Sequence, residues 1–183
     1  TFHTLKKLLK EAGYTTSVGD EGGFAPQVKN ADEAFDFLMK AIDKAGYTGK
    51  ISIAIDAAAS EFFVDGKYDV DGKKLSSSEL TEYYSELVNK YPLVIIEDSH
   101  NEDDWDGFTE MMTKMGDNVQ LVGDDLLVTN VERIKQAQDK KAVNSVLIKL
   151  NQIGSVTETV DAIKMTEDNG WQPVGSHRSG ETE

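Results

Sequence analysis

The sequence predicts an α/β fold in which buried parallel strands alternate with helices, and three observations support this prediction. Short apolar stretches rich in β-branched residues recur along the chain, and a segment with helical periodicity follows each one. Helix-start signals stand at the beginning of those segments, and charged residues follow the strands. Repetition of strand, helix and strand implies a parallel sheet with right-handed crossovers, either open and doubly wound or closed into a barrel. The periodicity does not choose between these two forms.

The strands are predicted from four nearly continuous apolar stretches. Such stretches are typical of parallel strands that are buried on both faces. They cover residues 51–55, 93–96, 119–122 and 145–150.

The helices are predicted from polar residues that are spaced as capping boxes, in which a side chain caps the helix and an acid follows three residues later. The four pairs are Asn30 with Glu33, Ser76 with Glu79, Thr129 with Glu132, and Ser155 with Glu158. The helix that begins after Asn30 carries Ala34, Phe37, Leu38 and Ala41 on one face and is expected to end near Gly46.

A single domain is predicted over residues 1–183. The Gly, Asp and Lys cluster at 65–74 is typical of an exposed turn or hairpin, and no segment has the composition of a linker. Residues 2–10 begin as an amphipathic helix with nothing before it, and residues 176–183 form a polar loop. We therefore expect the chain to be cut at both ends.

The composition excludes several classes of function. With 33 acidic and 19 basic residues the net charge is −14, which opposes binding to nucleic acid and favours a bound cation. The absence of cysteine excludes disulfides and thiolate metal sites and agrees with a reducing cytosol. No apolar run reaches the roughly 20 residues of a membrane span, and the first residues lack the apolar core of a signal peptide. We expect a soluble cytoplasmic protein.

Charged residues follow all four predicted strands. In a parallel sheet the strands' carboxyl ends lie at one edge, so these side chains are expected to converge. They are Asp56, Glu97, Asp98, Asp124, Asp125 and Lys149. A lone Asp after a strand more often caps a helix or starts a turn. Several acids brought together repel one another, and a proton or a divalent cation relieves that repulsion. Oxygen ligands without cysteine favour Mg²⁺ over Zn²⁺.

Lys149 lies in an otherwise apolar stretch, so its stem is expected to be enclosed. An enclosed lysine near metal ions would have a lowered pKa and could act as a base. The alternative is a lysine at a strand end whose ammonium reaches solvent.

Two loops also contain chemically useful groups. The Gly-rich stretch 18–26 carries Asp20 and Glu21 but lacks the spacings of nucleotide-binding loops. Residues 176–180 place His177 and Arg178 in succession, which suits a phosphate or carboxylate, although an exposed polar loop is the alternative.

Six motifs together resemble the enolase family, in the order that the family shows. They are VGDEGGFAP at 18–26, IDAAASEFF at 55–63, IED at 96–98, VGDDLLVTN at 122–130, KLNQIGSVTE at 149–158 and SHRSGETE at 176–183. The resemblance implies an incomplete enolase-type (β/α)8 TIM barrel, without the family's N-terminal α+β domain and the last barrel strands. We expect such a chain alone to expose sheet edges, to be poorly stable and to have little activity.

The resemblance also implies a reaction and its residues. The reaction is the Mg²⁺-dependent dehydration of 2-phosphoglycerate to phosphoenolpyruvate, a step of glycolysis. The implied roles are three Mg²⁺ ligands, Asp56, Glu97 and Asp124; the base Lys149; the acid Glu21; the substrate contact His177; and the phosphate-binding pair Arg178 and Ser179. Glu97, Asp124 and Lys149 would also face the substrate. Family members are at least dimers, so a homo-oligomer is expected.

Two positions depart from the family pattern. Ser99 and His100 stand where proline or glycine and an apolar residue are more common, and Gly175 replaces a residue that is commonly β-branched. The resemblance therefore does not extend to the loop after Asp98 and to the end of the strand before 176.

Two alternatives to this reaction stay open. One is another enolase-superfamily enzyme that removes the proton next to a different carboxylate. The other is a binding role at the cell surface, since enolases also capture plasminogen there, and residues 62–69 lie where such a loop occurs in some bacterial members. An exposed hairpin is the favoured interpretation of 62–69.

Overall fold

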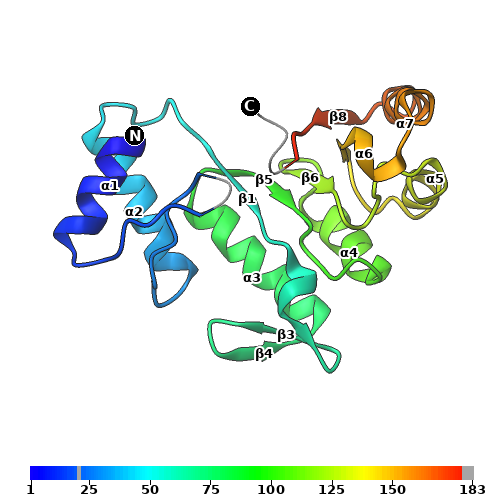
Figure 1. The fold of residues 1–183 in the computed structure, drawn as a ribbon. Coiled ribbons are helices and arrows are strands. Elements are labelled where there is room, and N and C mark those ends of the chain that lie inside the picture. Colours follow the sequence, from blue (N-terminus) through cyan, green and yellow to red (C-terminus); the bar gives the residue numbers. More distant parts are fainter. Residues whose placement is uncertain (20–21, 179–183) are drawn as a thin grey trace. The chain divides into compact units, whose positions relative to one another are not determined.

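The computed structural model describes residues 1–19 and 22–178, which form two compact units, Thr1–Ser52 and Ile53–Arg178 (Figure 1). Each unit is described by itself below. Within the described residues, no helix combines the length and the apolar character that a membrane span requires. The prediction of one domain over residues 1–183 stays a prediction.

The first unit is built on two helices, α1 at Phe2–Glu11 and α2 at Ala31–Lys44. Asn30 caps α2 as predicted, because its side chain accepts the Glu33 N–H at 3.0 Å. The helix ends two residues before Gly46, whose φ of 80° suits glycine at a helix end. The predicted apolar face is confirmed at Ala41, which is fully buried.

The second unit contains a five-stranded parallel sheet within its described residues, in the order β1-β5-β6-β7-β8. Its strands are β1 at Ile53–Asp56, β5 at Leu93–Glu97, β6 at Gln120–Gly123, β7 at Ser145–Ile148 and β8 at Gln172–Gly175. All four strands predicted from apolar stretches are confirmed. The apolar pattern did not predict β8, because this short edge strand contains Pro173 and ends at Gly175.

Helices connect the strands of the sheet and follow one another around it (Figure 1). They are α3 at Ser77–Lys90, α4 at Trp105–Met115, α5 at Val131–Lys140, the short α6 at Leu150–Ile153 and α7 at Val156–Asp168. The predicted caps Ser76 and Ser155 are confirmed, and Ser76 forms a complete capping box with Glu79. The prediction of Thr129 as a cap was wrong, because Asn130 caps α5 and Thr129 is buried with its hydroxyl bonded elsewhere.

An apolar core fixes α5 and α7 against the last strands of the sheet. Its members are apolar side chains from the sheet, from α4, α5 and α7 and from the connecting loops, and nearly all have no exposed surface. They are Phe108, Leu126, Leu127, Ile134, Ala137, Ala142, Val143, Val146, Ile148 and Ala162. Because β6 and β7 are buried on both faces, the positions where they end are held rigidly.

A small antiparallel sheet follows β1 and confirms the exposed hairpin predicted at 65–74. Its strands are β2 at Phe63–Val64, β3 at Lys67–Val70 and β4 at Lys73–Leu75. Both turns are Asp-Gly pairs, Asp65-Gly66 and Asp71-Gly72, and all four residues have positive φ. This is the geometry of type I′ turns, whose twist matches that of the adjoining strands.

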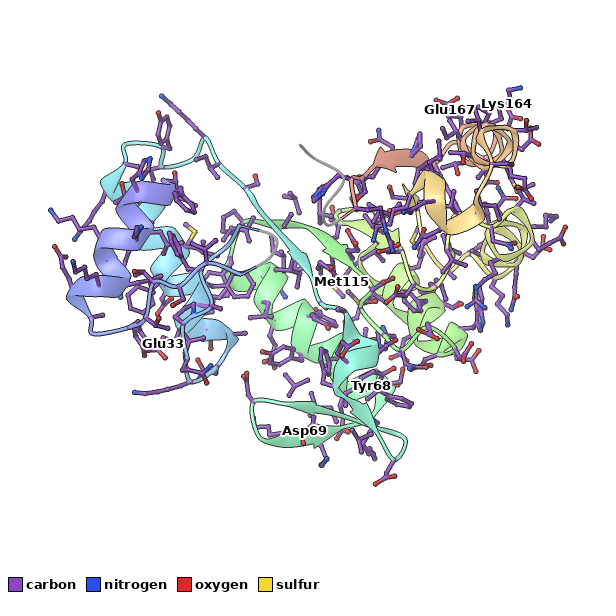
Figure 2. All side chains as sticks on the ribbon, in the orientation of Figure 1. Glu33, Tyr68, Asp69, Met115, Lys164 and Glu167 are labelled. Atoms are coloured by element: carbon purple, nitrogen blue, oxygen red, sulfur yellow. The ribbon has the colours of Figure 1, made fainter. Side chains whose placement is uncertain are left out.

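The side chain of Tyr68 anchors the hairpin to the loop after β5 (Figure 2). Tyr68 is buried, its hydroxyl donates to Asp104 Oδ2 at 2.7 Å, and it accepts the Asn101 N–H at 2.9 Å. Asp104 also caps α4 by accepting the Gly107 N–H at 3.0 Å. The hairpin, the loop after β5 and the start of α4 are thus joined through one carboxylate.

His100, the departure from the family pattern, is 1% exposed and lies in this same region. Its Nε2 approaches the Ser77 carbonyl at 3.2 Å, and its Nδ1 lies 3.0 Å from the Ser99 hydroxyl. A carbonyl can only accept, so the neutral ring carries its proton on Nε2 and accepts from Ser99 at Nδ1. The ring also packs edge-on against Tyr68 and Phe108. The loop after Asp98 therefore accommodates the unusual pair.

Replacing His100 by phenylalanine should remove part of the pH dependence of folding. Burial lowers the pKa of His100 below its ordinary value of 6.5. As the pH falls through 6.5, the unfolded chain binds a proton that the folded protein does not, so the folded state loses stability, by up to about 1.4 kcal/mol for each pH unit. Urea unfolding between about pH 7.5 and 5 should show this loss in the unsubstituted protein and a smaller one in His100→Phe.

Phe108→Leu is the matched control, because it disturbs the same packing without changing a titratable group. It should lower the unfolding free energy by a similar amount at every pH. Parallel profiles for the unsubstituted protein and His100→Phe would contradict the assignment of this acid sensitivity to His100.

Candidate functional site

Four of the six residues predicted at the strand ends are placed at the carboxyl edge of the sheet by the strands that they end or follow. Asp56 is the last residue of β1 and Glu97 the last of β5, and the two pair in register. Asp124 directly follows β6, and Lys149 directly follows β7. The convergence expected from the strand pattern is therefore confirmed at the level of the backbone.

Lys149 and Asp124 form an ion pair between Nζ and Oδ2. The two side chains are only 17% and 9% exposed, so the enclosed lysine stem predicted from the flanking apolar residues is confirmed. Attraction between charges is stronger at a partly dry site than in water. The pair fixes the lysine nitrogen at the same edge of the sheet as the other acids.

The carboxyl groups at this edge interact with one another. Burial, together with the charges of Asp56, Asp124 and Asp98, raises the pKa of Glu97 to about 7, and Lys149 opposes this rise. Asp56 is more exposed, and partial burial together with nearby carboxylates also raises its pKa. A group of acids in this state is relieved either by protons or by a bound cation.

Another set of carboxylates lies closest together among the described residues. Asp98, Asp124 and Asp125 offer oxygen atoms that all lie within 4.8 Å of one another, and this set shares only Asp124 with the predicted ligands. Asp98 is already engaged, because its Oδ1 and Oδ2 accept the N–H groups of Asp124 and Asp125 at 2.9 and 2.8 Å. Asp98 thus holds the loop that presents Asp124, and this favours a supporting role over metal binding.

The donor set suits a hard divalent cation. The strand ends supply carboxylate oxygens and no cysteine, and the set with oxygens within 4.8 Å of one another is Asp98, Asp124 and Asp125, which does not include Asp56 or Glu97. Mg²⁺ is bound in proteins through one or two carboxylates with retained waters, so Asp56, Glu97 and Asp124 are sufficient in number and type. Whether they coordinate an ion stays a prediction.

The segment after β8 brings two further predicted residues to this end of the sheet. Ser176 donates its N–H to the Ile148 carbonyl at 3.1 Å, which extends the pairing with β7 by one residue. His177 and Arg178 follow, and the His177 Nδ1 lies 3.2 Å from the Arg178 carbonyl. The Arg178 charge counteracts the burial and the Asp124 charge that raise the pKa of Asp125. The predicted residues Glu21 and Ser179 lie outside the described residues.

Two residues that the sequence analysis did not select also belong to this site. Gln152 donates from Nε2 to Asp124 Oδ1 at 2.9 Å, and Thr129 Oγ1 accepts the Lys149 N–H at 2.9 Å. Gln152 lies on the short helix α6, which directly follows Lys149. Thr129 resembled a helix cap in the sequence, and nothing in its type indicated its backbone conformation.

Comparison with known families decides the class of this fold. The family described as "Enolase, C-terminal TIM barrel domain" matches residues 1–183, the whole chain. The chain belongs to this enolase family. Its α/β architecture is therefore that of an enolase C-terminal TIM barrel, and the five-stranded parallel sheet is consistent with an incomplete barrel. The choice left open by the periodicity, between an open sheet and a barrel, falls on the barrel.

Replacing Glu97 by glutamine should stabilise the protein at neutral and alkaline pH when a chelator removes metal ions. The pKa of Glu97 is raised from 4.5 to about 7, so between these values the folded state binds a proton that the unfolded chain has released. The stability of the folded state therefore falls as the pH rises through this window. The Glu97→Gln variant should not show this fall, because glutamine does not ionise. Chemical unfolding between about pH 5 and 8 measures the difference.

The exposed Glu86 of α3 offers a matched control, since Glu86→Gln makes the same change away from the acids. Its profile should follow that of the unsubstituted protein. If Glu97→Gln also ran parallel to the unsubstituted protein at every pH, the raised pKa of Glu97 would be wrong.

Proposed function

We propose that this enolase domain carries the site that converts 2-phosphoglycerate into phosphoenolpyruvate with Mg²⁺. The observation that carries the proposal is the buried pair of Lys149 with Asp124 at the carboxyl edge of the sheet, beside Glu97 and Asp56. This arrangement offers a proton acceptor and cation ligands within one region. The SHRSGETE and VGDEGGFAP motifs favour this substrate over those of other enolase-superfamily enzymes.

The proposed chemistry explains why acids and a lysine are needed together. Removing a proton next to a carboxylate creates a second negative charge on a substrate that already carries a phosphate. A bound Mg²⁺ supplies the positive charge that makes such an anion accessible, and enolase-superfamily sites are a known example of a lysine or histidine base with one or two Mg²⁺ ions. Asp56, Glu97 and Asp124 are the residues that we propose to hold it.

Lys149 is the proposed base, and its Nζ receives the proton from C2 of the substrate. Its contact with Asp124 holds the nitrogen in place, and the enclosed stem restricts its side-chain conformations. The proposed partners in the reaction are Glu21, which assists departure of the C3 hydroxyl, and His177, Arg178 and Ser179, which contact the substrate and its phosphate.

Further parts of the proposal concern the whole protein. We propose a glycolytic lyase that acts in the cytoplasm as a homo-oligomer, at least a dimer. A surface role in which residues 62–69 bind plasminogen is a second candidate, and the exposed hairpin at these residues is the observation that allows it. Removal of metal by a chelator separates the two, because the binding role needs neither Mg²⁺ nor Lys149.

Replacing Lys149 by alanine should abolish turnover. Formation of phosphoenolpyruvate from 2-phosphoglycerate is measured in the full-length protein expected to carry this sequence, with and without Mg²⁺. Loss of a positioned base lowers rates by about 10²–10⁴-fold, and we expect at least the lower value for kcat. Lys149→Arg, which keeps the charge but stays protonated and so cannot accept the C2 proton, should be similarly impaired.

Lys164 on the exposed face of α7 is the matched control (Figure 2). Lys164→Ala should retain the turnover of the unsubstituted protein. Absence of Mg²⁺-dependent turnover in the unsubstituted protein would overturn the proposed reaction, and unimpaired turnover in Lys149→Ala would overturn the role of Lys149.

A further inference from the structure

Both oxygens of the Asp124 carboxylate have a partner within the described residues. Oδ2 pairs with Lys149 Nζ, and Oδ1 accepts a hydrogen bond from Gln152 Nε2 at 2.9 Å. Asp124 is 6% exposed, so water competes little for either oxygen. The carboxylate plane is therefore fixed from two sides by two different side chains.

The Thr129 hydroxyl lies at the other end of the Gln152 amide. Thr129 Oγ1 accepts the Lys149 backbone N–H at 2.9 Å and lies 2.9 Å from Gln152 Oε1. The Asp124 carboxylate needs a donor, so Gln152 turns its NH₂ toward Asp124 and its Oε1 toward Thr129. The Thr129 hydroxyl then donates to Oε1, which is nearer than its other acceptor, the Leu147 carbonyl at 3.4 Å. A carboxylate only accepts, so the two ends of the amide agree on one orientation.

These contacts close a ring. From Asp124 Oδ2 it runs through the Lys149 side chain to the Lys149 backbone, then through Thr129 and Gln152 back to Asp124 Oδ1. Each acceptor in the ring faces one donor. A closed ring of this kind fixes the distance between the carboxylate and the lysine more firmly than their own ion pair does.

The backbone that carries Thr129 is strained. Val128 and Thr129 have φ of 43° and 54°, and β-branched residues rarely adopt positive φ. The turn is held by the N–H groups of Leu127 and Val128, which donate to the Asp124 carbonyl at 3.0 and 2.7 Å. Strain of this size, of order 1–3 kcal/mol for each residue, is retained where the surrounding structure demands it and is frequent at functional sites.

We propose that Gln152 is a positioning residue for the cation ligand Asp124 and the base Lys149, and that Thr129 orients its amide. The inference rests on the proposed function of those two residues. Gln152 holds Oδ1 and Lys149 holds Oδ2, and each oxygen keeps a second lone pair with which it could bind a cation. The same amide connects to the lysine backbone through Thr129, so the ligand and the base are placed as one unit.

The first test removes the amide from the full-length protein. Gln152→Leu keeps the approximate size of the side chain but cannot donate to Asp124. Mg²⁺ affinity is measured by titration calorimetry without substrate, and kcat is measured separately at saturating Mg²⁺. Loss of a hydrogen-bond partner of a metal ligand typically weakens binding by 10–100-fold, and we expect a value in that range together with a lowered kcat.

Gln138→Leu is the matched control. Gln138 is also half-buried, and its Nε2 donates to the Met165 carbonyl at 3.0 Å, which joins α5 to α7 away from the acids. It should leave the Mg²⁺ affinity and kcat close to those of the unsubstituted protein. If Gln152 had only a structural role, Gln152→Leu would lower the melting temperature and leave the Mg²⁺ affinity unchanged.

A second pair of variants tests the orienting hydroxyl and does not depend on the folding of Gln152→Leu. Thr129→Val keeps the shape and removes the hydroxyl, whereas Thr129→Ser keeps the hydroxyl. Valine should reproduce the weakened Mg²⁺ binding, and serine should retain most of the original affinity. Thr166→Val is the control for loss of a buried hydroxyl, since Thr166 donates to the Ala162 carbonyl within α7 at 2.7 Å.

The outcomes separate the two proposals. Undiminished Mg²⁺ affinity in Gln152→Leu, or equal affinities in Thr129→Val and Thr129→Ser, would overturn the positioning role while the proposed function stood. If the unsubstituted protein neither bound Mg²⁺ nor turned over 2-phosphoglycerate, the proposed function and this inference would fall together.

Discussion

Repulsion among acids at one edge of a parallel sheet is the constraint on which this structure depends. The register that pairs Asp56 with Glu97 brings like charges together, and the partial burial of the site makes their ionisation costly. Lys149 is the cation that the chain itself supplies, and its pair with Asp124 is largely enclosed. Removing one member of such a pair leaves a buried charge without compensation, so the lysine stabilises the fold as well as serving the proposed chemistry.

The elements around the sheet are arranged to keep that edge rigid. The core beneath β6 and β7 holds the two strands that end before Asp124 and Lys149. Asp98 fixes the loop after β6 by accepting the N–H groups of Asp124 and Asp125. On the other side of β5, Tyr68 and Asp104 attach the hairpin to the loop after that strand. Polar networks that are satisfied in full restrict a site to one geometry, and this is the condition that proton transfer requires.

The strands were predictable because those buried on both faces must be apolar throughout, and the acids were predictable because strand ends meet at one edge. The apolar pattern did not predict β8, because this edge strand contains Pro173 and Gly175. Thr129 was misassigned as a cap because its role depends on a positive φ that a threonine does not signal. Gln152 was not selected, since an amide carries no charge and only the fold brings it to Asp124.

The two hairpin turns have a practical consequence for protein engineering. The turn at Asp71-Gly72 is tied to α3 because Asp71 Oδ2 accepts a hydrogen bond from the Tyr83 hydroxyl at 2.9 Å, whereas Asp65-Gly66 joins two short antiparallel strands through a left-handed turn of exposed residues. Extra residues at such a tip cost little, because loop-closure entropy grows slowly with length. The turn after β6 is different, because its backbone hydrogen bonds to the Asp124 carbonyl hold the segment from which Thr129 contacts Lys149. A reporter peptide or fluorophore attached at Asp65-Gly66 would therefore follow the protein and leave the carboxyl edge of the sheet undisturbed.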